Sequence, residues 1–161
     1  MKNHGLTREA AVQLAGKTND TGHAVSFPAT VHLSSDYFGG QLVLPDSKLK
    51  VIESPLKMTI FHGGQEKFKV ERFGLYFDSH IVPGTYPLGP NDFPAFMEIT
   101  IRDDVDAPET GFVQSGDVIL EVFDLTNRHV QGRLENVVVE IKMGPRITIS
   151  SGFFSSPPNK A

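Results

Sequence analysis

The fold is decided by the stretch GDVILEVFDLTNRHVQGRLENVVVEI, residues 116–141. In each half of it apolar residues occupy every second position: Val118, Leu120 and Val122, then Val137, Val139 and Ile141. The segment between them, 124–129, is polar and rich in turn formers. Alternation with a period of two is typical of a strand with one face in the core. Two such runs around a polar turn predict a β-hairpin.

The same alternation continues along the rest of the chain. The other runs are Val25–Leu33, Leu42–Leu44, Leu49–Val51, Leu56–Ile60, Phe68–Phe77, Ala95–Ile101 and Ile147–Phe153. Turn formers separate them, and the only helical pattern is a short one at Thr7–Leu14. We therefore predict an all-β fold, an antiparallel β-sandwich of about 8–9 strands with a barrel as the alternative and one short N-terminal helix.

Three runs carry finer predictions. Pro28 cannot donate a hydrogen bond to a neighbouring strand, so its run should lie on a sheet edge or contain a bulge. The Leu56–Ile60 run is a second candidate for edge pairing with another chain. Phe68 and Val70 alternate on even numbers, whereas the apolar residues from Phe73 onward alternate on odd numbers. This slip predicts a bulge or bend near Glu71 and Arg72.

The length of 161 residues suits one domain. We expect a polar, partly flexible segment over 1–22, a single β-sandwich domain over 23–154 and a disordered tail over 155–161. No apolar run is long enough for a transmembrane helix, so no transmembrane segment is expected.

Charge and cysteine content narrow the function. The net charge is −4, and the 15 Lys and Arg residues are scattered. Binding to a phosphate backbone needs a basic stripe, so nucleic acid is not an expected partner. The absence of cysteine excludes disulfides, thiolate nucleophiles and Cys-based metal sites.

The C-terminal half carries a series of turn and strand motifs. They are Pro83-Gly84-Thr85-Tyr86-Pro87-Leu88-Gly89, Ser115-Gly116-Asp117-Val118-Ile119, Asp124 with Asn127, Val130-Gln131-Gly132-Arg133-Leu134-Glu135, and Ile149-Ser150-Ser151-Gly152-Phe153-Phe154. This series, within 83–154, resembles a group of uncharacterised β-sandwich domains of bacterial envelope lipoproteins, a domain of unknown function. The resemblance implies a β-sandwich and a periplasmic or envelope location if a leader has been removed. Otherwise the first residues, which have no hydrophobic signal core, favour the cytoplasm.

Three loops are the candidate binding surface, because loops on a rigid sandwich commonly carry function. They are 83–94, 103–111 and 124–130. The candidate ligand-binding residues are Tyr86, Tyr37, Asn127 and Arg128. Each tyrosine can either be exposed to a ligand or pack over its loop with the hydroxyl hydrogen-bonded. A protein or a glycan is the expected partner.

The acidic loop 103–111 is the best candidate for a metal. Asp104, Asp106 and Glu109 could supply carboxylate oxygens to calcium, although Pro108 and the absence of the invariant glycine of an EF-hand loop rule out an EF-hand. The histidines show no zinc-binding spacing. No cofactor other than this calcium ion is expected.

The sequence contains no nucleophile elbow and no phosphate-binding glycine loop. These absences argue against an enzyme and favour a non-enzymatic binding module. Two alternatives stay open: a structural protein that assembles, for example as a homo-oligomer, through sheet edges, and a loop-calcium protein or a hydrolase with a spatially assembled site.

Overall fold

The computed structural model describes residues 24–44, 46–52, 58–63, 70–89, 94–102, 109–141, 144 and 146–157. This part of the chain forms eleven strands and one 3-10 helix. The elements are β1 (Ala24–Pro28), β2 (Thr30–Ser35), η1 (Asp36–Phe38), β3 (Gly40–Val43), β4 (Lys48–Ile52), β5 (Met58–Gly63), β6 (Val70–Asp78), β7 (Gly84–Pro87), β8 (Ala95–Ile101), β9 (Glu109–Asp124), β10 (His129–Ile141) and β11 (Arg146–Ser156). The predicted all-β class is confirmed, whereas the predicted helix over 7–14 lies outside the described residues.

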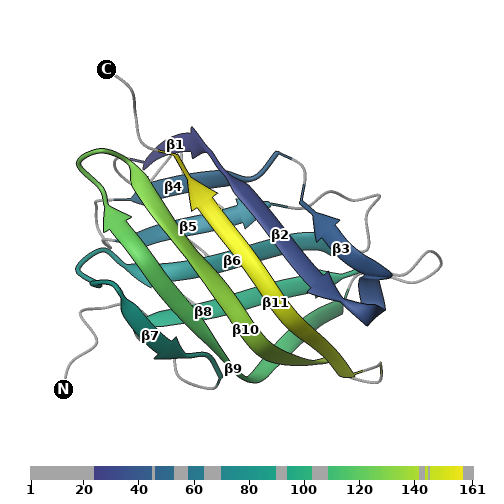
Figure 1. Ribbon diagram of the computed structural model, residues 1–161. Coiled ribbons are helices and arrows are strands. Elements are labelled where there is room, and N and C mark those ends of the chain that lie inside the picture. Colours follow the sequence, from purple (N-terminus) through teal and green to yellow (C-terminus); the bar gives the residue numbers. More distant parts are fainter. Residues whose placement is uncertain are drawn as a thin grey trace.

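The strands form one continuous antiparallel sheet that folds over on itself. Its order is β1-β4-β5-β6-β8-β9-β10-β11-β2-β3, and β7 pairs separately with β9. Figure 1 shows the result as two layers: β4, β5, β6 and β8 run behind β9, β10, β11 and β2. We call these layers the back sheet and the front sheet. The long strand β9 belongs to both, because it pairs with β8 at its start and with β7 further on.

The hairpin of β9 and β10 is confirmed, and both strands change phase near their middle. Asn136 and Val137 of β10 stand opposite Gly116 of β9, which is a β-bulge. Asn136 and Gly116 both have positive φ, 50° and 126°. A bulge turns side chains to the other face and increases the local twist. This bulge therefore allows two long strands to curve from the back sheet into the front sheet.

The opposite side of the sandwich closes at Pro28. The chain leaves β1 in the back sheet and enters β2 in the front sheet after one intervening residue, Ala29. The N–H of Ala29 donates to the carbonyl of Ser47 (3.0 Å), and the N–H of Leu44 donates to the carbonyl of Val31 (3.0 Å). The first of these bonds extends the pairing of β1 with β4, and the second extends the pairing of β2 with β3. The predicted 25–33 run is therefore two strands, and Pro28 ends the first of them on an edge.

Two further predictions concern pairing. The register between β6 and β8 shifts between Val70 and Arg72, so the predicted bulge near Glu71 and Arg72 is confirmed. The edge role proposed for the Leu56–Ile60 run is wrong for its described part, because β5 pairs with β4 on one side and β6 on the other. An apolar alternation shows that a strand has a buried face, but it does not show whether both of its edges are paired.

The strand count exceeds the 8–9 predicted for two reasons. The 25–33 run divides at Pro28, and β7 forms within the loop 83–94. In addition, β11 extends through Ser155 and Ser156, the first two residues of the predicted disordered tail. Ser156 is buried, and its hydroxyl donates to the carbonyl of Arg128 (3.1 Å).

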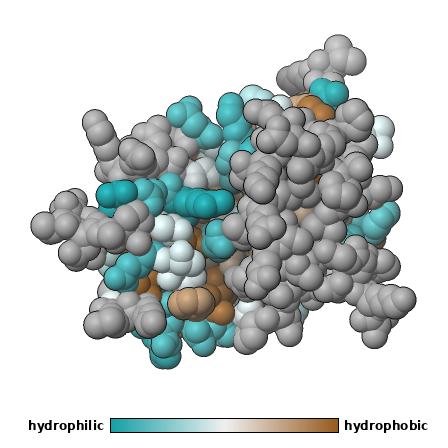
Figure 2. Space-filling model, turned by 180° about the vertical axis from the view of Figure 1, so that it is seen from behind, coloured by the Kyte–Doolittle hydropathy of each residue, from teal (hydrophilic) through white to brown (hydrophobic). Residues whose placement is uncertain are grey.

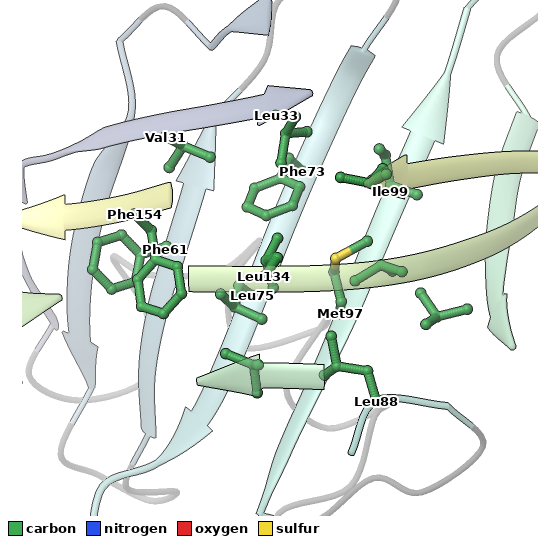
Figure 3. Close-up of a cluster of buried hydrophobic side chains, with 14 of the residues drawn as sticks. Val31, Leu33, Phe61, Phe73, Leu75, Leu88, Met97, Ile99, Leu134 and Phe154 are labelled. Carbon is green, nitrogen blue, oxygen red and sulfur yellow. The ribbon is translucent and has the colours of Figure 1, made fainter. Parts of the chain in front are cut away.

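The core lies between the two sheets. Figure 3 shows Phe61, Phe73, Leu75 and Met97 of the back sheet facing Leu134 and Phe154 of the front sheet. The ring of Phe154 lies 4.9 Å from that of Phe61 and 5.7 Å from that of Phe77. Gly132 leaves room for it, since a Cβ there would come within 2.5 Å of the Phe154 ring. Phenylalanine rather than tryptophan thus supplies the large core side chains.

Candidate functional site

The outer face of the back sheet carries a row of polar residues across four strands. Lys48 of β4 stands opposite His62 of β5, His62 opposite Gly74 of β6, and Gly74 opposite Glu98 of β8. Side chains alternate along a strand, and the intervening residues Leu49, Phe61, Leu75 and Met97 point into the core. The four residues therefore share the opposite face. We call them the outer row.

Gly74 has no side chain, and the ring of Tyr76 lies over it. A Cβ on Gly74 would lie only 2.6 Å from a ring carbon of Tyr76 and 2.8 Å from its hydroxyl oxygen. The same ring stacks on Phe96 with 4.5 Å between centroids and 8° between planes. Both rings are buried. Glycine at position 74 thus places a phenol hydroxyl in the row between His62 and Glu98.

The electrostatics of the row are uneven. Burial and the cations Lys50, Lys48 and Arg72 lower the pKa of His62 to about 4. Burial and Arg72 also lower the pKa of Lys50. At the other end Glu98 is largely buried and forms a loose ion pair with Arg72, with 4.0 Å between Nε and Oε1. The imidazole is therefore neutral at pH 7 in a positive field.

A cavity of about 520 Å³ adjoins the carboxylate end of the outer row. Its lining comes from the loop after β7, from β8 and from the first half of β9: Gly89, Glu98, Thr110, Gly111, Phe112, Val113 and Gln114. The Phe112 side chain is 55% exposed. Figure 2 shows the molecule from this side, where brown and teal residues lie next to each other in the coloured part. The cavity combines an open aromatic ring with a few polar groups.

The loop wall of the cavity is fixed by backbone contacts. The N–H of Leu88 donates to the carbonyl of Gly116 (2.8 Å), and the Leu88 side chain is buried. Gly89 follows so closely that a Cβ on it would lie 3.1 Å from the carbonyl oxygen of Gln114. The structure therefore brings the predicted loops 83–94 and 103–111 together at one site through Gly89, Thr110 and Gly111.

The third predicted loop, 124–130, lies at the tip of the β9–β10 hairpin. The N–H and the side-chain amide of Asn127 donate to the Asp124 carboxylate (3.1 and 2.7 Å), and these bonds lower the pKa of that carboxyl. Arg128, with φ of 59°, places its guanidinium 4.4 Å from the centre of the Phe27 ring of β1. The bonds of Asn127 thus stay within the hairpin turn, whereas Arg128 connects the hairpin to β1.

The two candidate tyrosines lie apart from the cavity lining. Tyr86 of β7 is half-buried, and its hydroxyl donates to the carbonyl of Val82 (2.5 Å). Tyr37 of η1 packs edge-on against Phe38 with 5.7 Å between centroids. Tyr37 follows the end of β2, whereas Arg128 adjoins the end of β11, and these two strands are antiparallel. Tyr37 and Arg128 therefore belong to opposite ends of the front sheet.

The proposed calcium ligands fall largely outside the described residues. Asp104 and Asp106 lie there, and Glu109 is exposed at the first position of β9. Within the part of the chain that the structure describes, no three His, Asp or Glu side chains gather as a metal-binding group.

The outer row and the cavity were missed at the sequence level. Their polar residues lie within strands, where a solvent-facing side chain is the ordinary interpretation: Lys48, His62, Glu98, Thr110 and Gln114. The available signal was Gly74 inside the aromatic run 73–77, because glycine within a strand often marks a close approach.

Comparison with known proteins adds no relative: no family model, curated protein or solved structure matches the chain. Among the described residues, no helix has the length and apolar character required to cross a membrane.

Proposed function

We propose that this protein is a non-enzymatic binding module that holds a glycan in the cavity between Gly89, β8 and β9. The observation that carries the proposal is Phe112, a large apolar side chain that is 55% exposed on a cavity otherwise lined by short or polar groups. An exposed aromatic residue at a concave site is more informative than an exposed residue on a flat surface.

The chemistry of the lining fits a sugar. A pyranose ring has an apolar C–H face, which packs on an aromatic ring, and a rim of hydroxyl groups, which need hydrogen-bond partners. Phe112 offers the ring, while Glu98, Thr110 and Gln114 offer a carboxylate, a hydroxyl and an amide. The volume of about 520 Å³ lies within the range typical of small-molecule sites.

The rigidity of the walls also supports binding. Two walls are strands, and the third is a loop anchored by Leu88 and its bond to Gly116. A site that is formed before the ligand arrives does not lose affinity to the ordering of its loops.

The experiment is a screen of the full chain on immobilised neutral oligosaccharides, followed by titration of any sugar that binds. Phe112→Ala and Glu98→Gln should each weaken binding at least about tenfold, which corresponds to about 1.4 kcal/mol. The matched control is Phe153→Ala, which removes an exposed phenylalanine from the front sheet.

Two results would overturn the proposal that the cavity binds a glycan. One is a screen without saturable binding, and the other is binding that Phe112→Ala leaves unchanged. If a protein is captured instead, and its binding depends on Phe112, the cavity is a protein-docking site.

A second candidate function is assembly through sheet edges. Among the described strands, β1 pairs only with β4 and β3 only with β2, and both carry exposed valines, Val25 at 48% and Val43 at 52%. An open edge presents unpaired backbone groups to another chain. Light scattering after size exclusion tests this candidate, because a strict monomer at high concentration removes it.

The resemblance to envelope lipoprotein domains extends the proposal to location. A binding module in a bacterial envelope would meet glycans directly. The intact mass of the native protein from fractionated cells is the test: a leader-cleaved or lipidated envelope form supports this location, and an unmodified soluble form contradicts it.

A further inference from the structure

The cavity on the outer face of β8 and β9 places a carboxylate beside an aromatic ring. Ile99 of β8 pairs with Gly111 of β9, and Glu98 and Phe112 flank this pair. Ile99 belongs to the core, and a Cβ on Gly111 would lie 3.3 Å from the Ile99 side chain, on the same side of the sheet. Since side chains alternate along a strand, Glu98 and Phe112 both point to the outer face. The two side chains therefore lie next to each other, and both line the cavity.

Glu98 keeps the capacity to bind a cation. Its side chain is 15% exposed, and its ion pair with Arg72 spans 4.0 Å between Nε and Oε1, which is too long for a hydrogen bond. Among the described residues, none donates a hydrogen bond to this carboxylate. The Arg72 side chain is 52% exposed, so water screens its charge. A cation inside the cavity could therefore bind the carboxylate more closely than Arg72 does.

The other polar side chains of the cavity can accept hydrogen bonds. The side-chain nitrogen of Gln114 donates to the carbonyl of Phe112 (3.4 Å), and its amide oxygen is left to accept. The Thr110 hydroxyl can accept as well. The described lining contains no Lys, Arg or His, so the carboxylate of Glu98 is its one formal charge. An ammonium group, which has three donors and no acceptor, matches such a lining.

We propose that the glycan held in this cavity contains an amino sugar with a free, protonated amino group, and that Glu98 binds the ammonium. The inference rests on the glycan function proposed above and names the class of sugar. Hydrogen bonds between an ammonium and a carboxylate are roughly twice as strong as neutral ones. The exposed ring of Phe112 adds to the attraction, because the face of an aromatic ring attracts a cation. A sugar that carries a carboxylate would instead be repelled by Glu98.

The test compares three sugars of equal length on the full chain. They are β-1,4-linked trimers of glucosamine, N-acetylglucosamine and glucose, which carry an ammonium, an acetamide and a hydroxyl group at the same ring position. Calorimetric titration at pH 6 keeps the amine protonated. We expect the glucosamine trimer to bind at least about tenfold more tightly than either neutral trimer.

Variants separate the contact with Glu98 from a general attraction of an acidic protein for cations. Glu98→Gln keeps the size of the side chain and should make the three sugars bind with about equal affinity. Glu121→Gln, which removes the same charge from an exposed position toward the hairpin end of β9, should keep the tenfold preference. Phe112→Ala should weaken all three sugars, because they share the C–H face that packs on the ring.

Equal affinity of the unmodified protein for the three sugars overturns the inference, and the glycan function stands if Phe112→Ala weakens their binding. A preference for the glucosamine trimer that persists in Glu98→Gln also overturns the inference. If none of the three sugars binds, the inference fails, and the oligosaccharide screen decides the glycan function separately. The comparison of the sugars needs no variant, so it decides the first point even if Glu98→Gln does not fold.

Discussion

The outer faces of the two sheets are built from similar residues in different environments. On the front sheet a cross-strand row runs through Thr85, Ile119, Arg133, Phe153, His32 and Val43. In this row Phe153 is 38% exposed, and a ring nitrogen of His32 has a partner in the side chain of Gln41 (3.2 Å). On the back sheet Phe96 is fully buried and His62 has an unpartnered nitrogen.

The charged groups of the two sheets also differ in their exposure to solvent. Arg133 of the front sheet pairs with Glu121 (3.3 Å) and Glu135 (3.6 Å), and all three side chains are more than one-third exposed. Water competes for such pairs, so they contribute little. On the back sheet, burial lowers the pKa values of His62 and Lys50. The comparison teaches that partial burial, more than residue type, makes the back face the better candidate for binding.

The largest expected difference lies between two phenylalanines. Phe96→Ala should lower the free energy of unfolding by about 3–5 kcal/mol, because it removes a buried ring together with its stacking on Tyr76. Phe153→Ala, on the exposed face, should cost less than about 1 kcal/mol. Urea denaturation of both variants measures the difference. Equal losses would contradict the contrast between the two faces.

The next effect concerns the glycine of the outer row. Gly74→Ala should destabilise the protein by about 1–3 kcal/mol, because the new methyl group meets the Tyr76 ring and displaces it from Phe96. Gly84→Ala is the control, since its nearest contact would be 3.5 Å, ordinary van der Waals distance. Thermal and urea unfolding of the pair provide the measurement. A tolerated Gly74→Ala would show that Tyr76 is not held over the glycine.

The lowered pKa of His62 predicts that the free energy of unfolding depends on pH. Its pKa is about 4 in the folded protein against an ordinary 6.5, so the unfolded chain binds a proton between these values and the folded chain does not. The free energy of unfolding should therefore fall as the pH decreases from 6.5 to 4. We expect a loss of about 1–2 kcal/mol, less than the full shift implies, because the ring is partly open to solvent.

Urea unfolding at pH 4.5 and 7.0 checks this prediction. His62→Gln should show a smaller difference between the two pH values than the unmodified protein, and Phe153→Ala should keep the original difference. An identical dependence in His62→Gln would assign the acid sensitivity to other groups.

The smallest effect is expected at the front-sheet ion pairs. Arg133→Gln should change the free energy of unfolding by no more than about 0.5 kcal/mol, because its two partners are solvated. The same measurement in 0.5 M salt should show no further change. A loss above about 1 kcal/mol would show that charged groups on the front face contribute to stability as partly buried groups do, and would contradict the contrast between the two faces.

Much of the fold could be predicted from local patterns. The β9–β10 hairpin followed from two alternating runs around a polar turn, and the bulge near Arg72 followed from a one-residue slip. Pro28 predicted an edge or a bulge because it lacks an N–H, and β1 lies at an edge of the sheet. These predictions succeeded because each depends on one strand and the chemistry of its own residues.

The candidate site could be predicted only in part. The loops 83–94 and 103–111 were singled out, and both contribute to the cavity, but the residues chosen within the three loops, Tyr86, Asn127 and Arg128, have contacts inside the protein. Turn-forming residues indicate that a loop exists. They do not indicate which of its side chains will bond to groups of the protein itself and which will face a ligand.

The sequence by itself determined the strand alternation, the hairpin and the interruption at Pro28, because side-chain period and backbone donors are local properties. Only the tertiary structure decided that Lys48, His62, Gly74 and Glu98 share a row and that Gly89 meets Gln114. Such neighbours are set by the register between strands and by the bend at Gly116 and Asn136, which join residues far apart in the chain. Burial of the outer row follows from the same packing, and with it the lowered pKa of His62.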